Sequence, residues 1–72
     1  MNKLNVAKIQ LNGNPYEINT ETNLNQLLNK LKIQKIKVAI ELNGVIVEKN
    51  KYPKVILNKG DKLEIVHFIG GG

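Results

Sequence analysis

The start of the chain alternates between hydrophobic and polar residues, which predicts a β-hairpin. The alternation runs over residues 7–11 and is the two-residue period of a half-buried strand. Asn12-Gly13 follows, and the alternation resumes over residues 16–18; an Asn-Gly pair between two such segments favours a hairpin. Residues 1–6 show no clear period, and we interpret them as a short N-terminal extension or the frayed start of the first strand.

A different period follows and predicts one helix. Leucines occur at the spacing i, i+3, i+4, i+7, which places them on one face of a helix; they are Leu24, Leu27, Leu28 and Leu31. Residues 19–23 before them are polar and include several residue types that cap helices. A helix of about ten residues is not stable alone in water, and one short segment without sustained heptads does not form a coiled coil. The helix is therefore expected to pack its leucines on a sheet.

The second half of the chain reads as further strands separated by turns. Residues 37–42 predict a strand, followed by a turn at Asn43-Gly44 and a short apolar run over residues 45–47. Residues 48–54 are polar and contain a proline, so we expect a loop or irregular crossing there. Residues 55–57 are interpreted as a short strand that could lie at an edge, residues 58–61 as a turn, and residues 62–69 as the longest strand.

This order of elements predicts an α+β fold of the β-grasp type. One helix would lie on one face of a mixed sheet of four to five strands, a two-layer arrangement that buries both apolar surfaces. In the β-grasp arrangement the final strand pairs beside the first at the centre of the sheet. The 72 residues suffice for one domain, residues 1–72.

The amino-acid composition argues against several classes of function. The net charge is +5, carried by eleven lysines without any arginine. The lysines are dispersed and aromatic residues are few, so we expect a solvated basic surface and no nucleic-acid partner. The chain has no cysteine, which excludes disulfides and thiolate chemistry. It also lacks an apolar run long enough to span a membrane, and we expect a cytoplasmic protein.

Few residues could perform catalysis or bind a metal. His67 is the only histidine, and the six acidic residues are scattered singly. Catalysis requires groups with matched roles that converge on one place, and a metal site requires several ligands. We therefore expect neither an enzyme nor a metal site.

The last strand and its glycine-rich end have the clearest functional character. Alternation places Leu63 and Ile65 toward the core, and Val66 and Phe68 on the opposite face, where an exposed apolar patch would mark a partner site. The alternative is that residues 48–54 cover that face.

Three glycines, Gly70, Gly71 and Gly72, follow Ile69. Extended, they could carry a carboxylate roughly 10 Å beyond the strand. We interpret residues 70–72 as a flexible tail that enters a partner, and the alternative is an ordinary frayed terminus.

Several segments, in their order along the chain, resemble the ubiquitin-like sulfur carriers of the ThiS type. The resemblance covers roughly residues 8–72. It rests on Leu11-Asn12-Gly13, on Leu27-Leu28, on residues 38–44 (VAIELNG), and on residues 60–69 (GDKLEIVHFI) leading into the glycines.

The resemblance implies a specific chemistry at Gly72. An adenylating enzyme of the E1 type (ThiF type) would use ATP to activate the terminal carboxylate, and a sulfur-transfer enzyme with its sulfur donor would complete a thiocarboxylate. Thiazole synthase (ThiG type) would receive the sulfur for the thiazole of thiamin. Gly70 and Gly71 would thread the partner's channel, while Val66, Phe68 and Ile69 would dock the carrier. The carrier itself would bind no cofactor and would be a monomer when free.

Three alternatives remain open on the sequence. Molybdopterin-type carriers have the same fold, terminus and activation chemistry, but their tails typically carry prolines before the glycines, and Phe68-Ile69-Gly70 has none. A ubiquitin-like modifier would be conjugated to lysines of other proteins. A β-grasp binding module with an inert tail, basic enough to touch RNA, is the third.

Overall fold

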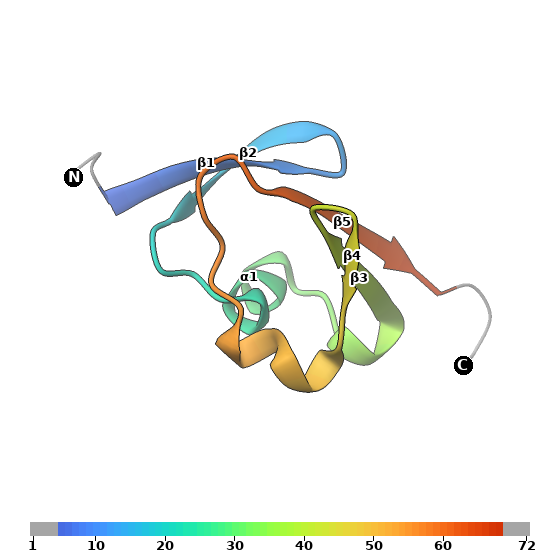
Figure 1. The fold of residues 1–72 in the computed structure, drawn as a ribbon. Coiled ribbons are helices and arrows are strands. Elements are labelled where there is room, and N and C mark those ends of the chain that lie inside the picture. Colours follow the sequence, from blue (N-terminus) through green and yellow to red (C-terminus); the bar gives the residue numbers. More distant parts are fainter. Residues whose placement is uncertain (1–4, 69–72) are drawn as a thin grey trace.

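Five strands form one mixed sheet in the order β2-β1-β5-β3-β4 (Figure 1). The computed structural model describes residues 5–68. Strand β5 lies between β1, with which it is parallel, and β3, with which it is antiparallel, so the predicted central place of the last strand is confirmed. The strands are β1 Val6–Leu11, β2 Asn14–Asn19, β3 Val38–Leu42, β4 Val45–Val47 and β5 Lys62–His67. The prediction of residues 62–69 as the longest strand is wrong, because β5 ends at His67 and its six residues equal those of β1 and of β2.

Both predicted Asn-Gly turns are present and have the same backbone form. Asn12 and Gly13 have φ angles of 49° and 85°, and Asn43 and Gly44 have φ angles of 52° and 86°. Positive φ at both central residues defines the type I′ turn, whose twist matches that of the flanking strands. The first strand begins one residue earlier than predicted, because Val6 pairs with Asn19. Val6 therefore belongs to the sheet and not to an N-terminal extension.

The helix α1, Leu24–Leu31, begins at a reciprocal cap. The Asn23 side chain accepts a hydrogen bond from the Gln26 backbone N–H (2.8 Å), and the Gln26 side chain accepts one from the Asn23 N–H (2.9 Å). This capping box satisfies two N–H groups that a helix otherwise leaves without partners. The leucine stripe faces the sheet, and Leu24, Leu27 and Leu28 are buried, as predicted. Figure 1 shows α1 on one side of the sheet, with the opposite side left open.

The predicted edge strand at residues 55–57 is wrong. Ile56 forms only an isolated bridge with Asn23, because this segment bonds to the start of α1 and the residues before it instead of to the sheet. Leu24 N–H donates to Val55 C=O, and Leu57 N–H donates to Thr22 C=O. The apolar pattern that suggested a strand serves the core, where Leu57 is buried. The edge strands are β2 and β4, and β4 is the apolar run behind the second Asn-Gly turn.

The expected loop at residues 48–54 is mostly a 3₁₀ helix, η3, Lys49–Lys54. A shorter 3₁₀ turn, η2, Lys35–Lys37, precedes β3. Tyr52 in η3 is fully buried and belongs to the main core. Its hydroxyl has no hydrogen-bond partner among residues 5–68. Burial raises the pKa of the Tyr52 phenol, and the nearby Ile40 backbone opposes only part of that rise.

Candidate partner-binding site at the end of strand β5

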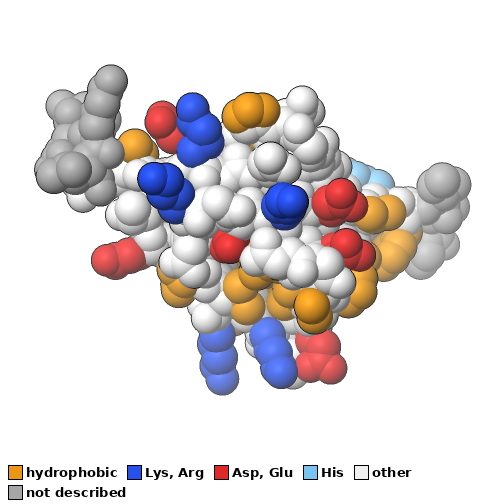
Figure 2. Space-filling view, turned by 45° about the horizontal axis from the view of Figure 1, so that its top comes forward, with side chains coloured by type: hydrophobic (Ala, Val, Ile, Leu, Met, Phe, Trp, Pro, Cys, Tyr) orange, Lys and Arg blue, Asp and Glu red, His pale blue; other side chains and the backbone are white. Residues whose placement is uncertain are grey.

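Two hydrophobic side chains are exposed where β5 ends. Leu63 and Ile65 are buried against the core, whereas Val66 and Phe68 are 57% and 54% exposed. The predicted division of this strand into a core face and an open face is confirmed. On the right of Figure 2, hydrophobic and acidic side chains lie next to one another on the surface. The alternative, that residues 48–54 cover Val66 and Phe68, is wrong.

One residue of that segment nevertheless contacts Phe68. The Lys49 ammonium lies 5.3 Å from the centroid of the Phe68 ring, within the range of a cation–π interaction. The same ammonium donates a hydrogen bond of 2.6 Å to the Val38 carbonyl, and the Phe68 N–H donates one of 2.9 Å to the Lys37 carbonyl. Lys49 thus holds the ring from one side and leaves about half of it open. No local pattern distinguishes Lys49 from the other lysines of the polar segment 48–54.

The side chain of Asn12 fixes the middle of β5. Its amide donates to the Ile65 carbonyl (3.0 Å), and its carbonyl oxygen accepts from the Ile65 N–H (2.7 Å). The Asn12 backbone N–H also donates to the Leu63 carbonyl (2.8 Å). The amide side chain therefore supplies the donor and acceptor that another residue of β1 would have supplied.

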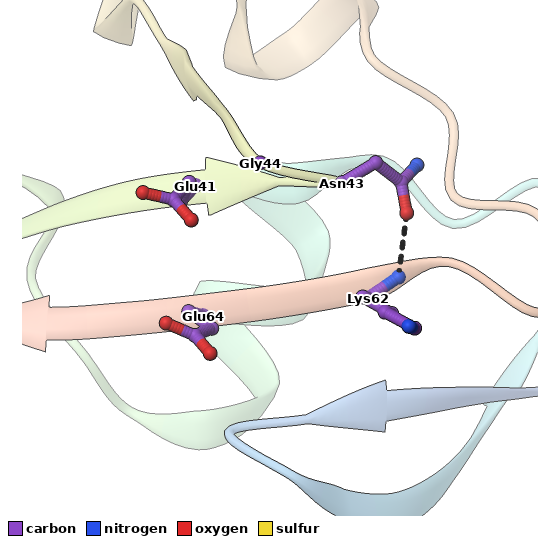
Figure 3. Close-up of a pocket in the computed structure, with 5 residues that line it drawn as sticks. All are labelled: Glu41, Asn43, Gly44, Lys62 and Glu64. Carbon is purple, nitrogen blue, oxygen red and sulfur yellow. Dashed lines mark hydrogen bonds between the residues drawn. The ribbon is translucent and has the colours of Figure 1, made fainter.

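Asn43, in the second turn, holds the start of the same strand. Its side-chain oxygen accepts from the Lys62 N–H at 2.9 Å, the dashed contact in Figure 3, and its amide donates to the Asp61 carboxylate at 3.0 Å. The Asn side chains of the two turns thus hydrogen-bond to β5 from the hairpins on either side of it. Sequence reasoning identified both turns and missed these side-chain bonds.

Two carboxylates lie side by side on the open face. Glu41 of β3 and Glu64 of β5 are directly opposite each other in the register, and both point to the same side of the sheet (Figure 3). With Asn43, Gly44 and Lys62 they line a shallow hollow of about 490 Å³. Like charges directly opposite in a sheet are destabilising. Within residues 5–68 the one ion pair joins Lys51 and Glu48, so neither carboxylate is neutralised by a salt bridge there.

Among residues 5–68 the open face carries exposed hydrophobic side chains at a strand end and no cluster of candidate metal ligands. In the part of the chain that the structure describes, no three His, Asp or Glu side chains gather in a way that could hold a metal ion. No helix among residues 5–68 is long and apolar enough to cross a membrane. The other predicted site residues, Ile69, Gly70, Gly71 and Gly72, lie outside the described residues.

The central β5, the single helix on one face and the exposed strand end define a β-grasp protein of the ubiquitin-like class. A family model described as the ThiS family matches residues 9–72, and the chain belongs to this family. It is 37% identical over 65 residues to the sulfur carrier protein ThiS of Bacillus subtilis, covering 89% of this chain and 98% of that protein.

A solved structure and a larger relative agree with this assignment. The crystal structure of the thiamine biosynthesis protein ThiS from Geobacter metallireducens superposes with a TM-score of 0.77 at 34% identity, covering 90% of this chain and 99% of the other. A thiazole synthase of Magnetococcus marinus is 45% identical over 65 residues, which is 90% of this chain. The chain spans only 20% of that thiazole synthase.

Proposed function

We propose that this protein carries sulfur for the thiazole moiety of thiamin, as a thiocarboxylate at Gly72. The observation that carries the proposal is the end of β5. The central strand of the sheet is fixed by Asn12 and Asn43, and Val66 and Phe68 are exposed at its end. The glycines follow immediately after Ile69 in the sequence. Membership of the ThiS family supports the same function.

The chemistry follows from the reactivity of a carboxylate. A terminal carboxyl group has a pKa of about 3.5 and is an unreactive anion at neutral pH. An adenylating enzyme of the ThiF type therefore joins a carboxylate oxygen to the α-phosphorus of ATP, and pyrophosphate leaves. Hydrosulfide released from the sulfur donor by a transfer enzyme then attacks the acyl carbon; a carbon–sulfur bond forms, AMP leaves with the former carboxylate oxygen, and a proton is released. The carrier supplies no catalytic group and binds no cofactor of its own.

The other predicted site residues bring the Gly72 carboxylate into the active site of a partner enzyme. Gly70 and Gly71 have no Cβ and pass through a narrow channel of the partner, while Val66, Phe68 and Ile69 form the apolar part of the docking surface. The carrier acts as a monomer in the cytoplasm, where ATP is available to the activating enzyme.

Thiazole synthase is the proposed acceptor of the sulfur. Its support comes from the thiazole synthases of Magnetococcus marinus and Paramagnetospirillum magneticum, each of which contains a stretch 45% identical to this chain. A protein that joins the two units in one chain keeps carrier and acceptor at high effective concentration. Separate proteins need the docking surface to achieve the same encounter.

The test is the intact mass of the carrier after incubation with ATP, an adenylating enzyme of demonstrated activity and a sulfur source. We expect one oxygen to be replaced by sulfur, at Gly72 in the fragment spectrum. An unchanged mass would refute the carrier function, and peptide remnants on lysines of other proteins would indicate a modifier. The thiocarboxylate form of the carrier should support thiazole formation by thiazole synthase and should not activate molybdopterin synthase. The reverse result would assign the protein to the molybdopterin pathway.

Phe68→Ala separates docking from folding. We expect the fold to survive, because the ring is half exposed, and the rate of thiocarboxylate formation at limiting carrier concentration to fall by about tenfold, as for one apolar contact of an interface. Ile46→Ala is the control, since Ile46 is also exposed but lies on the edge strand β4. Global unfolding of the Phe68 variant would show instead that the ring belongs to the core.

A further inference from the structure

Strand β5 extends beyond the end of its neighbour β1, although each strand contains six residues. The pairing of β1 with β5 covers only Gln10 with Lys62 and Leu11 with Leu63, and β1 then turns away at Asn12-Gly13. In Figure 3 the turn after β1 lies beside the middle of β5, and β5 runs on past it. The Asn12 side chain extends the pairing by one step, to Ile65. Beyond that point the described residues pair with β5 from the β3 side alone.

The hydrogen bonds along β5 show which way its next backbone groups point. Lys62 and Phe68 bond to the β3 side, through Asn43 N–H to Lys62 C=O and Phe68 N–H to Lys37 C=O. Leu63 and Ile65 bond to the β1 side, through Asn12. Backbone groups of successive strand residues alternate between the two sides. The N–H and C=O of His67 therefore face the β1 side, where residues 5–68 provide no strand.

We propose that an extended segment of thiazole synthase pairs with this open edge at His67, as an added strand. The proposal rests on the function proposed above. A backbone donor and acceptor on one exposed strand residue fit the backbone of another extended segment, the interaction of β-strand addition. The adjacent Val66 and Phe68 side chains then contact alternate side chains of the added strand.

The net charge of the protein argues against a second copy as the added strand. Strand addition between two copies would bring together two chains that each carry a net charge of +5, which like-charge repulsion opposes. His67 also immediately precedes the residues that lead to Gly72. A strand added here holds the backbone extended at the point where the thiocarboxylate must be directed into the acceptor.

The direct test is amide hydrogen exchange of the carrier with and without saturating thiazole synthase. In the free carrier, the His67 amide should exchange much faster than the Phe68 amide, which is bonded to Lys37. In the complex, we expect exchange at His67 to slow by about tenfold or more, as for an amide that gains a hydrogen bond. Unchanged exchange at His67 in the saturated complex would overturn the proposal. Protection that rises with carrier concentration alone would assign the edge to a second copy and overturn it too.

His67→Pro removes the N–H, and His67→Ala is the matched control that removes only the side chain. The chain already accepts Pro15 in the edge strand β2, the kind of position where a missing N–H is tolerated. We expect His67→Pro to weaken binding to thiazole synthase by about three- to tenfold, the net worth of one hydrogen bond, and His67→Ala to change it by less than about twofold. Equal affinities of the two variants would contradict the proposal.

Thiocarboxylate formation, followed by mass in the same variants, separates this proposal from the carrier function. We expect His67→Pro to gain sulfur as the unsubstituted chain does. If the unsubstituted chain gains none, the carrier function fails; if it gains sulfur while the exchange and affinity tests are negative, only the added strand fails. Should His67→Pro fail to fold, the exchange experiment on the unsubstituted chain decides alone.

Discussion

The two faces of the sheet differ in what their side chains accomplish. The covered face carries the core, in which helix leucines, strand residues and Tyr52 bury one another. The open face carries exposed Val66 and Phe68 and the opposed carboxylates of Glu41 and Glu64. Burial supplies most of the folding free energy of a small domain, so the covered face determines stability. The open face can therefore carry exposed hydrophobic side chains and a pair of like charges, which a binding partner can cover or neutralise.

The largest effect that tests this division is expected in the helix. Leu27→Ala should lower the free energy of unfolding by about 2–5 kcal/mol, because it leaves a cavity in a small core. Ile46→Ala, on the open side, should change it by less than about 0.5 kcal/mol. Urea denaturation followed by circular dichroism measures both. Similar losses for the two variants would show that the open side is part of the core.

A second pair of variants compares the two turns that hold β5. Asn12→Gly and Asn43→Gly keep the positive φ and carry the same entropic cost of glycine. Asn12→Gly should lower the free energy of unfolding by about 1–3 kcal/mol, since both Ile65 backbone groups lose their partner. Asn43→Gly should cost about 1 kcal/mol less, because its bonds are exposed to water that can replace them. Equal losses in chemical denaturation would mean that the Asn12 bonds add nothing.

Tyr52 gives the covered face a pH dependence. Its pKa is raised in the folded protein, chiefly by burial, so folding favours the neutral phenol. Its contribution to stability is complete below the unfolded pKa of about 10 and is lost as the pH rises above that value. Tyr52→Phe should remove this alkaline loss and change the free energy of unfolding at pH 7 by no more than about 1 kcal/mol, because the hydroxyl it deletes has no partner among residues 5–68. Denaturation at pH 7 and pH 11 tests this, and an identical pH dependence of the two proteins would contradict it.

The smallest expected effect concerns the opposed carboxylates. Glu41→Gln should raise the free energy of unfolding by about 0.2–1 kcal/mol, since it removes a like-charge pair. Glu17→Gln is the control of opposite sign, because Glu17 is opposite Lys8 in the β1–β2 pairing. Both changes should shrink in about 1 M salt, where charges are screened. A loss of stability in Glu41→Gln would show that the pair is not repulsive.

The sequence predicted the fold well where one local signal determined one structure. Both Asn-Gly turns, the leucine stripe and the alternation along β5 were of this kind. It failed at residues 55–57, because an apolar segment can enter a core without joining a sheet, and at residues 48–54, where Tyr52 anchors a polar segment. The roles of Asn12, Lys49 and the Glu41–Glu64 pair depend on residues far away along the chain, which no local pattern reveals.

The Asn12 side chain is also a site where slow deamidation would change the protein. Asparagine followed by glycine loses ammonia more readily than other pairs, because the glycine nitrogen attacks the side-chain carbonyl without steric hindrance. At Asn12 this reaction would replace the amide that donates to the Ile65 carbonyl with an anionic oxygen facing that carbonyl. At Asn43 it would place a second carboxylate beside Asp61. Deamidation of either turn would therefore weaken the side-chain hydrogen bonds that hold β5, at residues that are not part of the buried core.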